Sequence, residues 1–362
     1  MNPLPLIDGA LWVSGSWLET ISQCNRMAGF YKLDARVAAD TGIAKAFGTI
    51  LHKGLEMHYR CSEWAIDLAE RRTRVATIFA EEFAKVPTDF DDWRNLNWAL
   101  EIYDRWVAKS AGDPFQLLRF EKPRRCTKCN GPGCLWCNQI GYSSIMAEVP
   151  FAAKLFDYEP YPNNLGPEDI NTDSKLEWNN GPIPVYYHGY LDLAGQINGQ
   201  TWVRDWKSTA KLGPTFWSDK RMSLAQKGYC WGFERTTGIK VAGNIITALR
   251  TISPPDYVLQ NKPKRGGGEY KTIIQWWNES VCEEKIYLGE GELVEWQENA
   301  IALVEEFLWH HSRGFLPKRT TSCVGKYGPC DYIDVCGCFP PSEREGLLAS
   351  GMFRDKTNER NK

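Results

Sequence analysis

The sequence has almost no net charge, because 43 Lys and Arg residues are set against 45 Asp and Glu residues. Any contact with nucleic acid must therefore come from a local basic groove rather than from a global positive field. No apolar run approaches the roughly 20 residues that a membrane span requires. The opening MNPLPLIDGALW lacks the basic stretch and following apolar stretch of a secretory leader. We therefore expect a cytoplasmic protein that does not associate with membranes.

Internal repeats and extended low-complexity tracts are also missing. The composition, 43% hydrophobic and 24% charged, is that of an ordinary globular chain and excludes wholesale disorder. A length of 362 residues allows two domains, or one large domain with an appendage. Twelve cysteines in a chain expected in a reducing compartment indicate metal ligation before disulfide bonds.

The hydrophobic pattern predicts helices on either side of a strand-rich centre. Apolar residues at spacings of three and four predict helices over 17–33, 44–71, 91–109, 224–237 and 292–309. Strands are expected over 143–208, with a Pro/Asn/Gly-rich interruption at 160–184, and over 241–252, with an exposed basic hairpin tip at 263–268 and a frayed, charged tail after Pro340. This order predicts an α/β or α+β fold with a mixed central sheet.

The segment GYLDLAGQINGQTWVRDWKST predicts a β-hairpin, because Asn198-Gly199 supplies the two positive-φ residues of a type I′ turn. In the register that this turn sets, Asp192 lies directly across from Asp205. Lys207 follows on the same face, since side chains alternate along a strand. The other face is the expected core side and carries Leu191, Leu193, Ile197, Trp202 and Trp206.

The two facing carboxylates need something that relieves their repulsion. At about 5 Å they repel by about 3 kcal/mol at an effective dielectric of 20, and by under about 1 kcal/mol in water. A divalent cation relieves this repulsion, and a neighbouring lysine can orient or activate water for attack on a phosphate. The alternative is a solvent-facing hairpin whose hydrated carboxylates are balanced by Lys207.

A second segment, FGTILHKGLEMHY, predicts a helix on which His52 and Glu56 share a face at i and i+4. Gly48, one turn earlier, allows a close approach of the helix to a neighbour. A helical histidine taken alone is more often a packed or exposed residue than a metal ligand.

Together these segments resemble the PD-(D/E)xK nuclease superfamily, and within it the RecB-like branch of CRISPR-associated and AddB-type exonucleases. The motifs occur in the family's order: a G-x-x-x-H-x-x-L-E helix, a glutamate at 148, G-x-x-D ending at Asp192, D-x-K from Asp205 to Lys207, and a helix with Gln226 and Tyr229. The branch has Q-x-x-x-Y, whereas this chain has one residue fewer between Gln226 and Tyr229.

The resemblance implies a restriction-endonuclease-like core with a Mg²⁺ or Mn²⁺ site. His52, Asp192 and Asp205 would be its ligands, and a mixed His and carboxylate set suits Mn²⁺ better than an all-oxygen site would. Lys207 would position the attacking water or stabilise charge on the phosphate. Gln226 would orient DNA or the site.

Glu148 is a candidate outer-shell acid, with a surface glutamate as the alternative. The implied activity is metal-dependent hydrolysis of phosphodiester bonds at DNA ends, in recombination, repair or DNA processing, with a helicase or recombination protein as a partner. The alternative function is a non-catalytic nucleic-acid-binding adaptor on a nuclease scaffold. The intact Asp192, Asp205 and Lys207 argue against the adaptor, because an inactive site would not require two carboxylates to face each other.

Cysteines form two sets. CVGKYGPCDYIDVCGC contains Cys323, Cys330 and Cys336, and Cys24 stands alone near the other end. Three clustered thiolates and one distant thiolate can ligate a [4Fe–4S] cluster that ties the chain ends together, as in iron–sulfur members of the RecB-like branch. Cys338 could replace Cys336, and a zinc site or unligated thiols are the alternatives. In the relatives the first two C-terminal cysteines are closer than Cys323 and Cys330.

The second set, CTKCNGPGCLWC, has two C-x-x-C pairs that can wrap a tetrahedral Zn²⁺ and is similar to DnaJ-type cysteine-rich repeats. Its members are Cys126, Cys129, Cys134 and Cys137. Adventitious thiols or a second iron–sulfur site are the alternatives. The flanking Arg124 and Arg125 are candidate contacts to the DNA backbone, although such a charge run is more often a solvated face.

These assignments divide the chain into five expected segments. They are a helical region with the His52 helix (1–120), the four-cysteine insertion (121–142), the nuclease core (143–260), a helical region with the iron–sulfur cysteines (261–340), and a tail (341–362).

Overall fold

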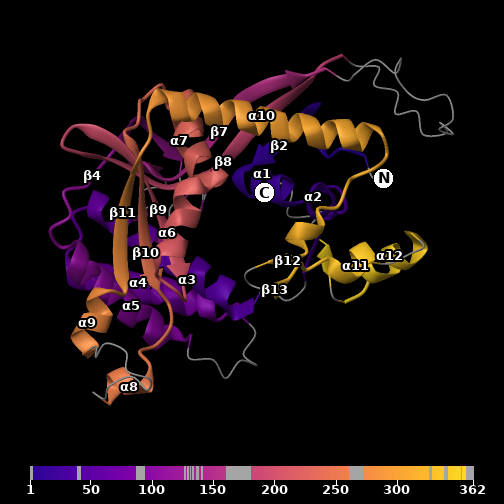
Figure 1. Cartoon of the computed structure of the whole chain (residues 1–362). Coiled ribbons are helices and arrows are strands. Elements are labelled where there is room, and N and C mark those ends of the chain that lie inside the picture. The colour runs from indigo at the N-terminus through magenta and orange to yellow at the C-terminus, as the bar shows by residue number, and fades with distance from the viewer. Residues whose placement is uncertain are drawn as a thin grey trace, which may run out of the picture.

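The computed structural model describes residues 3–38, 42–86, 94–125, 128, 130, 132, 134–135, 138–139, 142–159, 181–260, 272–325, 328–337, 341–351 and 353–355. A mixed β-sheet forms the centre, and helices cover both of its faces (Figure 1). The predicted α/β class with a mixed central sheet is therefore confirmed. The segment at 263–268, and residues 160–180 of the interruption at 160–184, lie outside the described residues. No helix in the described part is long and apolar enough to span a bilayer.

The central sheet has the order β1-β2-β8-β9-β10-β11, and β4 and β7 also pair with β8. Its strands are β1 (Leu6–Ile7), β2 (Ala10–Ser14), β4 (Gln116–Leu117), β7 (Ala147–Tyr158), β8 (Ile183–Ile197), β9 (Gln200–Thr209), β10 (Gly243–Arg250) and β11 (Val281–Tyr287). Strands β7, β8 and β9 are successively antiparallel, whereas β10 is parallel to β9 and β2 is parallel to β8. Three small two-stranded sheets pair β5 (Arg119–Arg125) with β6 (Tyr142–Ile145), β12 (Val324–Gly325) with β13 (Gly328–Pro329), and β3 (Arg36–Ala38) with β14 (Phe353–Asp355).

The helices are α1 (Gly15–Gln23), α2 (Asn25–Lys32), α3 (Gly42–Glu63), α4 (Leu68–Phe83), α5 (Leu96–Ser110), α6 (Pro214–Met222), α7 (Leu224–Thr237), α8 (Asp256–Leu259), α9 (Ile273–Asn278), α10 (Glu290–Ser312), α11 (Ile333–Gly337) and α12 (Pro341–Leu348). One core layer joins α1, α7 and α10 to one face of the sheet, and a second joins α3, α4 and α5 to the other. The helix predicted over 224–237 is confirmed with those bounds.

Two predicted helices are each split in two. Cys24 has an extended backbone, with φ of −165°, and separates α1 from α2. The helix predicted over 44–71 ends at Glu63 and restarts at Leu68, where the side chain of Asp67 accepts a hydrogen bond from the Glu70 amide. Apolar periodicity crosses both breaks because the helices on either side pack on the same core.

The β8–β9 hairpin has the register that the Asn-Gly turn predicts. Leu193 pairs with Arg204, and Ile197 pairs with Gln200. Asn198 has a φ of 51°, and Gly199, the second turn residue, has a φ of 77°. This pairing is what brings the two acidic positions of the hairpin to one level of the sheet.

Both faces of the hairpin are covered, so the prediction of a single core side is only partly right. Trp202 and Trp206 are buried on the expected side. Ala194 and Val203, on the face of the two aspartates, are buried as well because α7 and α10 pack against that face. Asp205 is only 3% exposed, which excludes a freely hydrated hairpin at this position.

Along β7 and β8, alternate side chains change from one face of the sheet to the other at the level of Glu148. Ala147 and Leu193 pack in the core layer of α3, whereas Val149 and Leu191 pack in the opposite layer. Glu148 has a φ of 50°, a left-handed conformation that breaks the alternation of a regular strand. The prediction that Leu191 and Leu193 share a face is therefore wrong.

The predicted frayed tail is also wrong for the described residues after Pro340. They form α12 and β14, and β14 pairs with β3 from the N-terminal part of the chain. Leu348 and Phe353 are buried in a small apolar cluster with Phe30 and Tyr332. A few apolar side chains within a charged segment are enough to dock it against the N-terminal helices.

Arg204 is a buried cation on the face of β9 opposite Asp205. It is 1% exposed, donates to the Tyr59 hydroxyl at 3.0 Å, and pairs with Asp113 and, at 3.2 Å, with Glu283. Tyr59 belongs to α3, and Asp113 follows α5. The guanidinium therefore ties the second core layer to the central strand.

Replacing Arg204 with methionine should lower the free energy of unfolding by about 3 kcal/mol, because loss of one partner leaves the other buried charges uncompensated. Urea unfolding followed by circular dichroism measures this loss. Arg221→Met is the control, since it removes an exposed arginine paired with Glu284 and should cost under about 1 kcal/mol. Equal losses in the two variants would contradict the assigned role of Arg204.

Candidate active site

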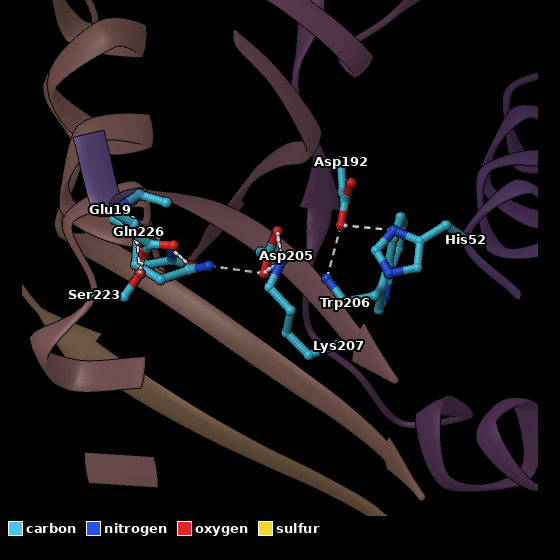
Figure 2. A network of polar contacts seen from close by, with 10 residues as sticks. Glu19, His52, Asp192, Asp205, Trp206, Lys207, Ser223 and Gln226 are labelled. Atoms are coloured by element: carbon cyan, nitrogen blue, oxygen red, sulfur yellow. Dashed lines mark hydrogen bonds and ion pairs between the residues drawn. The ribbon is translucent and has the colours of Figure 1, made fainter. Parts of the chain in front are cut away.

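Side chains from α3, β8, β9 and α7 meet beside the hairpin (Figure 2). His52 of α3 has its Nδ1 atom 3.4 Å from Oδ2 of Asp192 on β8. Lys207 places its Nζ atom 2.7 Å from Oδ2 of Asp205, its neighbour on β9. Gln226 of α7 donates from Nε2 to the same Asp205 oxygen at 3.0 Å. The structure thus brings together five of the residues that the sequence motifs single out.

Helix α3 reaches the hairpin because Gly48 has no side chain. A Cβ atom at position 48 would lie 2.4 Å from Oγ of Ser208, the residue after Lys207. The close approach expected of this glycine is therefore present, and it sets the height of His52 over the hairpin. The imidazole also lies edge-on to the Trp206 ring, with 6.2 Å between ring centres.

The backbone fixes Asp192. The Trp206 amide donates to Oδ2 of Asp192 at 2.8 Å, so this carboxylate bridges the two strands of the hairpin. Burial works to raise the pKa of Asp192, but the charge and hydrogen bond of His52, with the Trp206 amide, hold it below its usual value. Asp192 is therefore ionised at neutral pH.

The pKa values of Asp205 and Lys207 are both raised, but for different reasons. Burial, together with the charge of Asp192, raises the pKa of Asp205 above its usual value despite the nearby ammonium. Burial works to lower the pKa of Lys207, but the charges of Asp205 and Asp192 outweigh it and leave the pKa raised. Lys207 is therefore a firmly protonated cation beside an acid whose charge is incompletely neutralised.

A second row of polar groups, which sequence reasoning missed, supports Gln226. The Asn244 amide of β10 donates to the Gln226 side-chain oxygen. Ser223 caps α7 by accepting from the Gln226 amide and donates its own hydroxyl to Glu19 of α1. The serine directly before the predicted helix was the one available signal, since Ser is a preferred N-cap residue.

Glu148 and Glu56 add further acid to the site. Burial, and after it the charges of Glu56 and Asp192, raises the pKa of Glu148 to about 7. Glu56 is 1% exposed and pairs with Arg60 at 2.7 Å and with Lys128 at 3.7 Å. Glu148 therefore lies within electrostatic reach of Asp192, as an outer-shell acid would.

The departure from Q-x-x-x-Y has a simple structural result. Cys230, at the position where the branch has tyrosine, is fully buried in the core. Tyr229 is half-buried, and burial together with the charge of Asp205 raises the pKa of its hydroxyl to about 12. The shortened spacing therefore still leaves a tyrosine on the site's side of α7.

Two histidines of α3 have opposite environments. His52 keeps a raised pKa because Asp192 outweighs burial. His58 is half-buried against Tyr103 and Trp106, and burial lowers its pKa to about 4. Only His52 has the carboxylate neighbour that a ligand position at an acidic site requires.

The donor set fits a hard divalent cation. Two carboxylates and one imidazole lie together, and mutual repulsion with Asp192 contributes to the raised pKa values of Asp205 and Glu148. Within the described ranges, no three His, Cys, Asp or Glu side chains already converge at metal-binding spacing. Asp205 instead turns to Lys207 and Gln226.

Thiols from the two chain ends lie in one neighbourhood. Cys330 and Cys336 each interact electrostatically with Cys24 and Cys323, and the Arg319 amide donates to the Cys24 sulfur at 3.5 Å. The β12–β13 hairpin turns the chain back, so that the Cys330 amide donates to the Cys323 carbonyl at 2.8 Å. This hairpin absorbs the wide spacing between the two residues, but no three of these described thiols converge at metal-binding spacing.

The other cysteines are less informative. Of the four-cysteine insertion only Cys134 is described, and it is half-buried. Cys126, Cys129 and Cys137, like Cys338, lie outside the described residues. Arg124 and Arg125 are exposed on β5, whose two-stranded sheet with β6 is separate from the central one.

Three antiparallel strands, a crossover helix and a parallel fourth strand, with D-x-K on the third, define a restriction-endonuclease-like fold. The chain belongs to the PD-(D/E)XK nuclease superfamily, whose family model matches residues 13–337. The match concerns the superfamily as a whole and assigns no branch within it. No curated protein shows a significant match to the sequence.

Gly48→Ala should lower nuclease activity by about tenfold to a hundredfold, because a methyl group against Ser208 displaces α3 and with it His52. Adding Ser208→Ala removes the clashing oxygen and should restore most of the activity. Initial rates on linear DNA with Mn²⁺ measure both effects, and thermal unfolding confirms that the variants fold. A double variant as impaired as the single one would show that this contact does not position the helix.

Proposed function

We propose that this protein is a Mn²⁺- or Mg²⁺-dependent deoxyribonuclease that hydrolyses phosphodiester bonds at DNA ends. The observation that carries the proposal is that His52 of α3 meets Asp192, Asp205 and Lys207 of one largely buried hairpin. A structural ion pair would need one acid for one base. Here the charge of Asp192 contributes to the raised pKa values of both Asp205 and Glu148, although Lys207, Lys128 and His52 act to lower them.

His52, Asp192 and Asp205 would hold the cation, which when bound supplies Lewis acidity toward the phosphate and a more acidic water. The Trp206 amide keeps Asp192 in place, and Gln226 does the same for Asp205. These contacts preorganise the two carboxylates before substrate arrives.

Lys207 is suited to stabilise charge that develops on the phosphate. The charges of Asp205 and Asp192 keep its ammonium protonated, and it is 27% exposed, so it can reach a ligand. A fixed cation beside developing negative charge lowers the barrier most when water is excluded. In the alternative function, a non-catalytic adaptor, these groups would bind a DNA phosphate without cleaving it.

We assign the protein to the RecB-like, iron–sulfur branch of the superfamily. The motif order and the neighbouring thiols of Cys24, Cys323, Cys330 and Cys336 support this assignment. A cluster there would be structural and would clamp the two chain ends. The proposal also includes Zn²⁺ in the four-cysteine insertion, contacts of Arg124 and Arg125 with the DNA backbone, a helicase or recombination partner and a cytoplasmic location.

Asp192→Asn and Lys207→Met should each reduce Mn²⁺-dependent degradation of end-labelled linear DNA by at least about a hundredfold, because each removes charge from the reacting centre. Asp157→Asn is the matched control, since this exposed acid pairs with Lys154 near the end of β7. Full activity in either site variant would overturn the catalytic assignment. Wild-type protein that binds DNA but does not cleave it, with its cluster intact, would favour the adaptor.

Anaerobically purified protein should be brown and contain about four irons per chain, as a [4Fe–4S] cluster requires. Cys330→Ala should bleach the protein and lower its melting temperature, whereas Cys282→Ala, a half-buried thiol outside the group, should change neither. Metal analysis of the same sample should find about one zinc per chain. A colourless, iron-free preparation would rule out the cluster.

A further inference from the structure

Helix α6 connects the strand of Asp205 and Lys207 to the helix of Gln226, yet it contributes nothing to the core. None of its nine residues is buried. A surface helix of a globular protein usually packs an apolar stripe against its neighbours. In Figure 1, α6 follows the site strand and lies next to α7. A helix in this place without a buried face is available for a ligand.

The C-terminal turn of α6 is held firmly by its neighbours. Arg221 donates to both carboxylate oxygens of Glu284 on β11, from Nε and, at 3.0 Å, from Nη2. Ser223 follows at once as the cap of α7 and donates to Glu19. These two anchors fix the orientation of the turn that carries Lys220.

Lys220 is a half-buried cation on this anchored turn. Its Nζ atom lies 5.7 Å from the ring centre of Phe216, which is one turn earlier on the same face of α6. Its charge interacts with Lys207 and Asp205 of the site. Among the ion pairs of the described residues, Lys207 has Asp205 as a partner at 2.7 Å, whereas Lys220 takes part in none.

Two ammonium groups near one another favour an anionic ligand between them or beside them. Burial, and then the charge of Lys207, lowers the pKa of Lys220, and the nearby carboxylates of Glu19, Asp205 and Asp219 offset this only in part. A phosphate oxygen that accepts a hydrogen bond from Lys220 would remove this repulsion through a charge-assisted contact. In a nucleic-acid strand the phosphates follow one another along the backbone, so a strand with one phosphate at Lys207 has another close by.

We propose that Lys220, supported by the ring of Phe216, binds the phosphate that neighbours the scissile phosphate of the substrate strand. Helix α6 is then part of the strand-binding surface rather than a linker between β9 and α7. This inference rests on the proposed nuclease function, since it assigns Lys220 to the substrate of the same site. Its contact is with the backbone, so it favours no base sequence.

The test compares DNA binding by wild-type protein, Lys220→Gln, Lys220→Arg and Lys240→Gln. Lys240 is 74% exposed and pairs with Glu234 near the far end of α7, which makes it a control of equal charge change. Fluorescence anisotropy with a short fluorescein-labelled single strand, over a salt series without divalent cations, gives affinities and salt slopes. Lys220→Gln should weaken binding roughly tenfold and reduce the salt slope by about 1, while Lys220→Arg and Lys240→Gln stay close to wild type.

Kinetics with Mn²⁺ separate this contact from the chemistry. Lys220→Gln should raise KM and leave kcat nearly unchanged, because the contact is made with ground state and transition state alike. Unchanged affinity and salt slope in Lys220→Gln would overturn the inference, and so would an equal loss in Lys240→Gln. A lower melting temperature with unchanged affinity would show a structural role only.

The outcome also distinguishes this inference from the proposed function. If wild-type protein cleaves DNA and Lys220→Gln matches it in affinity and KM, the inference fails and the nuclease function stands. If wild-type protein neither binds nor cleaves DNA, the proposed function fails, and the inference fails with it.

Discussion

The site depends on one electrostatic constraint: two aspartates are held at the same level of a β-hairpin that is covered on both faces. Burial deprives Asp192 and Asp205 of the water that would otherwise screen them. His52, the Trp206 amide and Lys207 relieve only part of the resulting repulsion. Helix α3, the cap of α7 and the second row of polar side chains are all placed so that this arrangement persists.

Local chemistry made much of this arrangement predictable from sequence. The Asn-Gly turn alone sets the pairing of Leu193 with Arg204, because a hairpin of fixed loop length has one register. Helical spacing places Gly48 one turn before His52 on the same side of its helix, and the cap residues of α7 mark where that helix begins and ends. In each case the information lies within a few consecutive residues.

What the sequence could not predict depends on contacts between distant segments. The left-handed backbone of Glu148 reverses the faces of β7, and no local signal marks a glutamate for that conformation. The buried network of Arg204 requires partners from α3, the end of α5 and β11. Periodicity likewise runs through Cys24, whose extended backbone separates two helices that share a core.

The meeting of the two chain ends has a consequence for biosynthesis. Ser322 donates to the Gln23 carbonyl, 299 residues away in the sequence. Strand β3 can form its two-stranded sheet only after β14 has been synthesised. Among the described strands, β2 has only the two-residue strand β1 as a neighbour until β8 has been made. The first helices therefore leave the ribosome long before their partners exist. Such non-local pairing slows folding and leaves apolar surface exposed to chaperones until the partner segments have been synthesised.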